Sequence, residues 1–231
     1  MDDKILFVWD FHGVLEKDNE YAVQEVCNLV LKDFGTDREI SLEETINWYG
    51  LSFFDYFRLA VPRGNPELWQ SMVKKTLSLE EIGWDIIKKY IKPRDFSEEV
   101  LKTIKDKGHH NIVLSNSRPQ HTKRFVRVIG LTDYLEEIIG ADTHRDIHIR
   151  NNSFINKEIH SIKAEILNNF LKDKNYKKVI VVGDKGGDIK AGKKCGAVTY
   201  LFFDPEINKN PGEAGADYII SDLREVLKEL N

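Results

Sequence analysis

The chain has 231 residues, which is room for one large domain or for a domain that carries a smaller one. Its hydrophobic fraction of 41% suffices for a packed core, and its 31% of charged residues is typical of a soluble protein. The net charge of −4 offers no broad basic surface, which argues against nucleic-acid binding. No apolar run reaches the roughly 18 residues of a membrane span, so we expect no membrane partner.

The chain start and the cysteines favour a cytoplasmic protein. The start of the chain, Met1-Asp2-Asp3-Lys4, is acidic and leads directly into a strand-like run, unlike a secretory signal. Cys27 and Cys195 are the only cysteines, and they lack the spacing of a metal site. A reduced setting is therefore expected, with a monomer as the default state.

The first predicted element is an apolar strand that stops at Asp10. After Leu15 the pattern becomes helical and shows no convincing strand until residue 94. Ser41 and Ser78 each precede Leu-Glu-Glu and match a capping box, so each is predicted to begin a helix. We therefore predict an inserted helical cap domain at residues 16–94.

Strands and helices alternate in the remainder of the chain. The predicted strands lie at residues 111–115, 135–141, 178–182, 197–203 and 218–220, with helices between them, the first capped by Asp95. This alternation predicts an α/β fold, a Rossmann-like, doubly wound parallel sheet with right-handed crossovers. Residues 1–15 and 95–231 would form this catalytic core. The polar stretch Thr143–Asn156 fits neither pattern and is either a hairpin or an excursion from the core.

Acidic residues follow two predicted strands near opposite ends of the chain. Asp10 ends the first strand, whereas Gly183, Asp184 and, four residues later, Asp188 follow the strand at 178–182. The carboxyl ends of parallel strands share one edge of a sheet, where ligands bind, so these carboxylates should converge. Converging carboxylates repel one another, and a hard cation is their natural neutraliser. The pattern therefore predicts metal-assisted group transfer.

Four motifs in chain order carry a family resemblance. They are Asp10-Phe11-His12-Gly13-Val14, then Val113-Leu114-Ser115-Asn116-Ser117, then a lysine that opens a helix, and finally Gly183-Asp184-Lys185-Gly186-Gly187-Asp188. Together they resemble the haloacid dehalogenase superfamily of phosphohydrolases, in the subgroup with a helical cap after the first motif. Lys163 is the chosen lysine and Lys157 the alternative. The resemblance covers nearly the whole chain.

The resemblance implies a role for each of several side chains. Asp10 would be the nucleophile that forms an aspartyl-phosphate, which splits one difficult displacement into two easier ones. Lys163 would neutralise charge on the nucleophile and on the transferring group. The Ser115 hydroxyl, with donors nearby at Asn116, would bind the phosphoryl oxygens.

The resemblance also implies Mg²⁺ as the cofactor. Asp10, Asp184 and the backbone carbonyl of His12 would hold the ion, and Asp188 would either bind it or orient another ligand. Carboxylates, carbonyls and water are the ligands that this small, hard cation prefers. The retained aspartates at positions 184 and 188 argue against the metal-free dehalogenase branch of the family.

His12 departs from the family pattern, which has an aspartate there as general acid and base. Histidine can itself move protons near neutral pH, so an active or slow phosphatase is the first interpretation. The second is an impaired, phospholigand-binding or regulatory module. The third is phosphonate cleavage, which would need a cap lysine, such as Lys74 or Lys75, to form a Schiff base.

The leading prediction is Mg²⁺-dependent hydrolysis of a small phosphate monoester. A cap over the site would exclude water and bulky substrates, which favours a small phosphorylated metabolite. A second metal site at His144, Asp146 and His148 is not predicted, because the alternating trio lacks a fourth ligand and the tight spacing of a zinc site.

Overall fold

The computed structural model describes residues 2–48, 51–140, 159–204 and 215–230. Its contacts divide the chain into two compact units, one formed by Met1–Glu16 with Pro93–Asn231 and the other by Lys17–Lys92. The stretch Thr143–Asn156, with its two histidines and Asp146, lies outside the described residues, as does Lys157.

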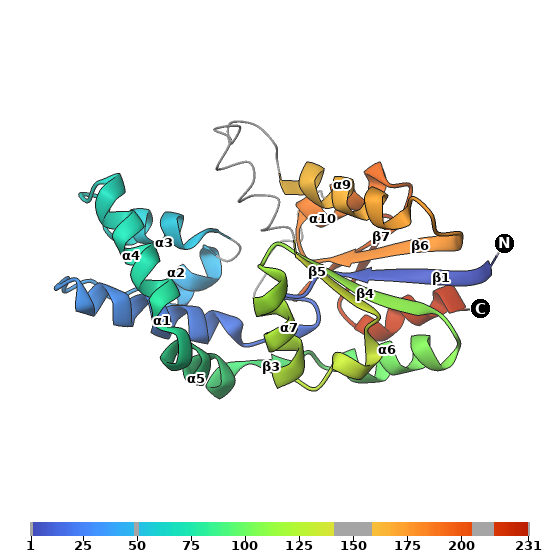
Figure 1. Cartoon of the computed structure of the whole chain (residues 1–231), viewed down its shortest axis with the longest axis horizontal. Helices are drawn as coiled ribbons and strands as arrows, with labels where there is room; N and C mark the ends of the chain where they lie inside the picture. Colours follow the sequence, from blue (N-terminus) through green and yellow to red (C-terminus); the bar gives the residue numbers. More distant parts are fainter. Residues whose placement is uncertain (1, 49–50, 141–158, 205–214, 231) are drawn as a thin grey trace. The chain divides into compact units, whose positions relative to one another are not determined.

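The first unit is built on a six-stranded sheet in the order β5-β4-β1-β6-β7-β8, in which every neighbouring pair is parallel (Figure 1). The strands are β1 (Asp2–Trp9), β4 (His110–Ser115), β5 (Glu137–Gly140), β6 (Tyr176–Gly183), β7 (Val198–Phe202) and β8 (Tyr218–Ile220). The predicted α/β, Rossmann-like fold is confirmed.

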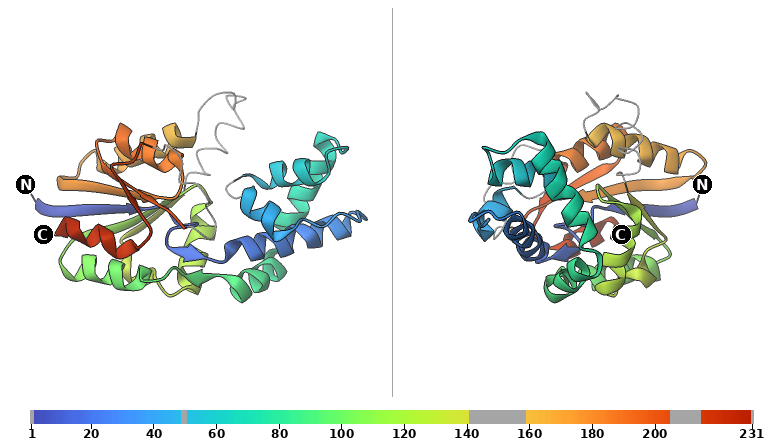
Figure 2. Two further views of the ribbon diagram at one scale, coloured as in Figure 1. Left: turned by 180° about the vertical axis from the view of Figure 1, so that it is seen from behind. Right: turned by 60° about the vertical axis from the view of Figure 1, so that its left-hand side comes forward.

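Helices cover both faces of this sheet, as the two views of Figure 2 show. One face carries α9 (Ile159–Leu171) and α10 (Gly186–Lys194), and the other carries α6 (Ser97–Asp106), α7 (Pro119–Val128) and the 3₁₀ segments η1 (Thr132–Tyr134) and η2 (Leu223–Leu230). Because both faces are covered, the central strand is apolar from Ile5 to its end, and Leu6, Phe7, Val8 and Trp9 are at most 1% exposed. The buried Trp9 indole is satisfied by Asn111, whose Oδ1 accepts its N–H at 3.0 Å.

The strand order creates a switch point at β1. From β1 the chain moves outward through β4 to β5, and it then returns to the opposite side of β1 with β6. Trp9 pairs with Val113 on one side and with Val182 on the other. The carboxyl ends of β1, β4 and β6 therefore meet at one edge, where open α/β sheets bind their ligands.

The second unit is helical. It contains α1 (Asn19–Asp33), α2 (Leu42–Asn47), α3 (Phe53–Ala60), α4 (Pro66–Ser78) and α5 (Glu80–Tyr90). These helices share a core of their own, formed by residues that include Val26, Cys27, Val30, Leu31, Phe57 and Met72. The predicted capping box at Ser41 is confirmed, since the hydroxyl accepts the Glu44 N–H and the Glu44 carboxylate accepts the Ser41 N–H.

Two local predictions for the inserted segment and its boundary are wrong. Residues 16–94 do contain strands, because β2 (Glu16–Lys17) pairs with β3 (Lys92–Pro93) where the chain passes between the units. Ser78 does not cap a helix but ends α4, and its hydroxyl donates to the Lys75 carbonyl at 2.7 Å instead. Serine hydroxyls readily bond to a carbonyl of the preceding turn, and a hydroxyl used in this way does not cap the next helix.

The N-cap of α6 also differs from the prediction. Phe96, with φ of 63°, occupies the cap position rather than Asp95, and no side chain caps the helix.

Among the described helices, none has the length and apolar character needed to cross a membrane.

The turn between α6 and β4 contains a histidine that the fold holds as a hydrogen-bond acceptor. His109 Nδ1 accepts the backbone N–H of Ile5 at 3.2 Å, which requires an unprotonated nitrogen. Burial, helped by the positive charge of Lys107, lowers the pKa of His109 below its ordinary value of 6.5.

We expect His109 to make the protein less stable in mild acid. Its contribution to the unfolding free energy is present above the unfolded pKa, near 6.5, and is lost as the pH falls through the lower folded pKa. His109→Asn places a non-titrating acceptor there, so it should reduce the Tm difference between pH 7.5 and pH 5 by roughly 1–3 °C. An unchanged difference in thermal melts would contradict this role.

Candidate active site

Three carboxylates converge at the carboxyl edge of the sheet. The Asp10 N–H donates to the Val182 carbonyl at 2.8 Å, so the β1–β6 ladder continues up to this residue. Asp184 follows the end of β6, and Asp188 lies in the first turn of α10. One oxygen from each of Asp10, Asp184 and Asp188 lies within 4.8 Å of the others. The strand ends therefore deliver their acidic residues to one place.

Gly183 makes room for Asp188. A Cβ at position 183 would lie 2.2 Å from the Asp188 Cβ and 2.8 Å from its Oδ2, which no side chain can tolerate. The Lys185 backbone N–H donates to Asp188 Oδ2 at 3.3 Å and fixes the carboxylate from the other side. The motif alone does not explain this glycine, whereas the close approach of Asp188 gives a steric reason for it.

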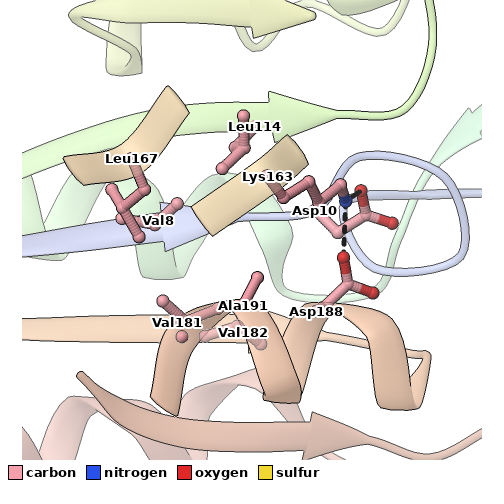
Figure 3. A pocket seen from close by; sticks show the side chains of 10 residues that line it. Val8, Asp10, Leu114, Lys163, Leu167, Val181, Val182, Asp188 and Ala191 are labelled. Carbon is pink, nitrogen blue, oxygen red and sulfur yellow. Dashed lines mark hydrogen bonds and ion pairs between the residues drawn. The ribbon is translucent and has the colours of Figure 1, made fainter. Parts of the chain in front are cut away.

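Lys163 lies between two of the carboxylates. It projects from α9, is 2% exposed, and its Nζ donates to Asp10 Oδ1 at 2.8 Å and to Asp188 Oδ1 at 2.5 Å (Figure 3). Burial lowers the pKa of Lys163, but the charges and hydrogen bonds of the two aspartates outweigh it and raise the pKa above its ordinary value. The ammonium group is therefore held charged inside the protein.

The site nevertheless retains an excess of negative charge. Burial, followed by the charge of Asp10, raises the pKa of Asp184 to about 7, and the Lys185 Nζ at 3.4 Å only partly offsets this. Burial likewise raises the pKa of Asp188 despite its bond to Lys163. Carboxylates whose ionised forms are disfavoured in this way would be stabilised by an added cation.

The donor set fits a hard divalent cation. All three groups offer carboxylate oxygens, the ligand type that Mg²⁺ prefers, and no softer sulfur or imidazole ligand from the described residues joins the cluster. Throughout the described part of the chain, this is the one group of three acidic, histidine or cysteine side chains close enough to share an ion.

Ser115 is the last residue of β4, and Asn116 directly follows it. Ser115 is 1% exposed, and its Oγ accepts the Ser117 N–H at 3.2 Å, whereas Asn116 is exposed. The pairing of Val113 with Trp9 brings the end of β4 to the same edge of the sheet as Asp10. The hydroxyl hydrogen of Ser115 is not used by that bond and is available to an acceptor.

His12 has a partner that the sequence analysis missed. Its Nδ1 lies 2.9 Å from Oε1 of Glu16, whose side chain is 0% exposed. Burial lowers the pKa of His12, but the hydrogen bond to Glu16 and the negative charges of Glu16, Asp10 and Asp184 outweigh it and raise the pKa above 6.5. The only sequence signal was an acidic residue four positions after the departure from the family motif.

A small cavity of about 10 Å³ lies behind the charged groups (Figure 3). Apolar side chains form most of its wall, namely Val8, Leu114, Leu167, Val181, Val182 and Ala191. A space of this size holds about one water molecule. Since Lys163 is itself buried, its charge lies in largely apolar surroundings. Charge interactions are stronger in such surroundings than in open solvent.

Comparison with known proteins identifies the family. The model of haloacid dehalogenase-like hydrolases matches residues 6–196, a span that includes Asp10, Ser115, Lys163 and Asp188. The chain belongs to this family of hydrolases.

Individual relatives agree with the family match. The chain is 24% identical over 226 residues to a protein named "Putative pyrophosphatase PpaX" from Caldanaerobacter subterraneus, covering 96% of this chain and 92% of that protein. It is 25% identical over 181 residues to a phosphoglycolate phosphatase from Aquifex aeolicus, covering 74% and 79%. The crystal structure of a predicted phosphoglycolate phosphatase from Haemophilus somnus matches with a TM-score of 0.77 over 100% of both chains, at 16% identity, which supports the shared fold.

Removal of the Lys163 ammonium should destabilise the metal-free protein. Lys163→Met leaves two buried carboxylates without their shared partner, which we expect to lower the unfolding free energy by about 3–5 kcal/mol in urea titrations. The exposed Lys190 on α10 provides the matched control, Lys190→Met, with an expected change near zero. Equal effects of the two substitutions would show that the buried ion pairs contribute nothing.

Gly183→Ala should weaken any binding of Mg²⁺ at the carboxylate cluster by about 10–100-fold, because the added methyl group displaces the Asp188 carboxylate. Isothermal titration calorimetry would measure the affinity. Gly83 in α5 has only an ordinary contact at 3.7 Å, so Gly83→Ala serves as the control and should bind normally. Normal binding by both variants would rule out a contribution of Asp188 to the metal site.

Proposed function

We propose that this hydrolase is a Mg²⁺-dependent phosphatase of small phosphate monoesters that works through an aspartyl-phosphate at Asp10. The observation that carries the proposal is the cluster in which Lys163 joins Asp10 to Asp188 beside Asp184, at the switch point of the sheet. The phosphatase and pyrophosphatase names of the two sequence relatives support the same reaction class.

In the first step, a carboxylate oxygen of Asp10 attacks the phosphorus atom. The bond from phosphorus to the ester oxygen breaks, and the leaving oxygen takes a proton from His12. In the second step, His12 takes a proton from water, the water oxygen attacks phosphorus, and the bond to Asp10 breaks. The products are the alcohol and inorganic phosphate, and Asp10 and His12 return to their starting states.

Lys163 and Ser115 would assist both steps. The ammonium of Lys163 holds one oxygen of Asp10 at 2.8 Å, which orients the nucleophile and offsets negative charge as the phosphoryl group approaches. The Ser115 hydroxyl and the nearby donors at Asn116 would bind phosphoryl oxygens.

Asp10 and Asp184, with Asp188 and the backbone carbonyl of His12, would hold Mg²⁺. When bound, the ion neutralises the repulsion between the carboxylates and the anionic substrate. The electrostatics of Asp184 support this assignment. Burial and the charge of Asp10 raise its pKa to about 7, which shows that its negative charge is poorly compensated. A cation bound beside it would supply that compensation.

The helical unit, residues 17–92, is proposed as a cap that limits access to the site. Such a cap favours a small metabolite over a phosphoprotein as substrate.

Phosphonate cleavage receives no specific support, since Lys75 pairs with Asp33 at 2.9 Å within the helical unit and Lys74 is an exposed residue of α4. A cytoplasmic monomer remains the proposed physiological form.

Asp10→Asn should abolish turnover while leaving the fold intact. We expect Mg²⁺-dependent phosphate release from a panel that includes phosphoglycolate and pyrophosphate, and a loss of about a thousandfold or more in the variant, because an amide cannot replace the attacking carboxylate. Asp106→Asn, at an exposed pair with Lys102, is the matched control.

The outcomes of this assay separate the alternatives. Full activity in Asp10→Asn would reject the nucleophile assignment. No release from any member of the panel, together with ligand-induced thermal stabilisation, would favour a binding module over a phosphatase.

A further inference from the structure

The segment after Asp10 folds back on itself and brings position 16 to position 12. The Phe11 carbonyl accepts the N–H groups of Val14, Leu15 and Glu16 at 3.3, 3.0 and 3.3 Å. Gly13 permits the turn, with a φ of 84°. His12 and Glu16 form a backbone bridge in this loop, so their side chains meet without any helix between them.

Arg94 holds the loop in place. Its Nη2 donates to the carbonyls of Gly13 and Glu16 at 3.2 and 3.4 Å, and its backbone N–H donates to the Leu15 carbonyl at 2.9 Å. The guanidinium is 8% exposed and also pairs with Asp204. A buried arginine with these partners fixes the loop backbone, and the position of Glu16 is thereby fixed as well.

The His12 ring is confined on several sides. Phe11 and Phe125 contact it edge-on, with ring centroids at 5.1 and 5.0 Å, and Glu16 contacts Nδ1 at 2.9 Å. The Glu16 side chain is 0% exposed, whereas 19% of the His12 side chain remains exposed. The ring is therefore anchored at its Nδ1 edge while part of the side chain stays exposed.

We propose that Glu16 is a positioning residue that fixes the orientation and tautomer of His12. An ionised carboxylate only accepts hydrogen bonds, so Nδ1 carries a hydrogen in both the neutral and the protonated ring. All proton exchange then takes place at Nε2. The inference rests on the proposed function, in which Nε2 gives its proton to the leaving oxygen and later takes one from water.

The need for Glu16 follows from the residue type at position 12. The two oxygens of an aspartate are equivalent, so either can transfer the proton. A histidine has two distinct nitrogens, and a ring without a partner would distribute the hydrogen between them. The buried carboxylate removes that ambiguity, much as a buried acid does when it orients a catalytic histidine in other enzymes.

Glu16→Gln tests the proposal, because the amide keeps the size of the side chain but can present either an oxygen or an NH₂ group to Nδ1. We expect kcat to fall by about 10–100-fold with KM changed less than about twofold. Glu229→Gln alters another buried carboxylate, one that pairs with Lys178 and Tyr200, and should leave kcat unchanged.

A double-mutant cycle separates positioning from a general structural effect. In the His12→Asp background, which has no ring to orient, Glu16→Gln should cause no further loss of kcat. An equal loss in both backgrounds would overturn the proposal.

The tautomer can be measured without any substrate. In ¹⁵N-labelled native protein, at a pH where the ring is neutral, the His12 signals should show hydrogen on Nδ1, and Glu16→Gln should shift the population toward Nε2–H. The ring-nitrogen signals that disappear in His12→Asn are those of His12. Predominant Nε2–H in the native protein would overturn the role of Glu16. If Nδ1–H is found in a protein that releases no phosphate, the positioning by Glu16 stands and the phosphatase proposal fails.

Discussion

The buried ammonium of Lys163 is the interaction on which the arrangement of the site depends. It lies 2% exposed and bonds to two aspartates that come from different elements, one 153 positions and the other 25 positions away in sequence. Ion pairs removed from water are costly unless their hydrogen bonds are well formed. Here the sheet and two helices supply that geometry, so the energetic cost of burying the charges is offset by contacts that only the folded chain provides.

Each neighbouring feature then has a reason related to this pairing. The parallel register of β1 and β6 brings Asp10 next to the end of the neighbouring strand, and the absence of a side chain at Gly183 lets the first turn of α10 approach closely enough for Asp188 to reach the ammonium. Apolar side chains, among them Leu167 from the same helix as Lys163, line the small cavity beside the cluster. A site with three carboxylates around one buried ammonium, and with the half-exposed Lys185 at its side, is thus assembled as an anion-rich cluster that suits a cation.

Much of this arrangement is predictable from the sequence, and the exceptions have physical causes. Apolar runs that stop at Asp10 and before Asp184 identify strand ends, and the topology rule brings strand ends together. The assignment of Lys163 to the site depended on the family resemblance. Helical periodicity alone predicts an exposed lysine there and does not reveal that its partners are buried. Glu16 was not predicted, since its contact with His12 depends on a tight loop rather than on any regular periodicity. Ser78 and Asp95 failed as caps because local hydrogen bonds and a left-handed Phe96 competed with the expected ones.

The pairing of the first strand has a consequence for how the chain acquires its structure. β1 lies between β4 and β6, and its partners in β6 begin at Tyr176. β1 is therefore synthesised well before its second neighbour exists. Until β4 has been made, the apolar side chains of β1 have no neighbouring strand to pair with, and contacts between such distant segments form slowly. The helical unit, by contrast, is built from contacts within residues 17–92 and can form while the ribosome is still at work. The segment that leads to Asp10 is thus an unpaired hydrophobic strand in the nascent chain until β4 follows, and it needs protection from aggregation during that interval.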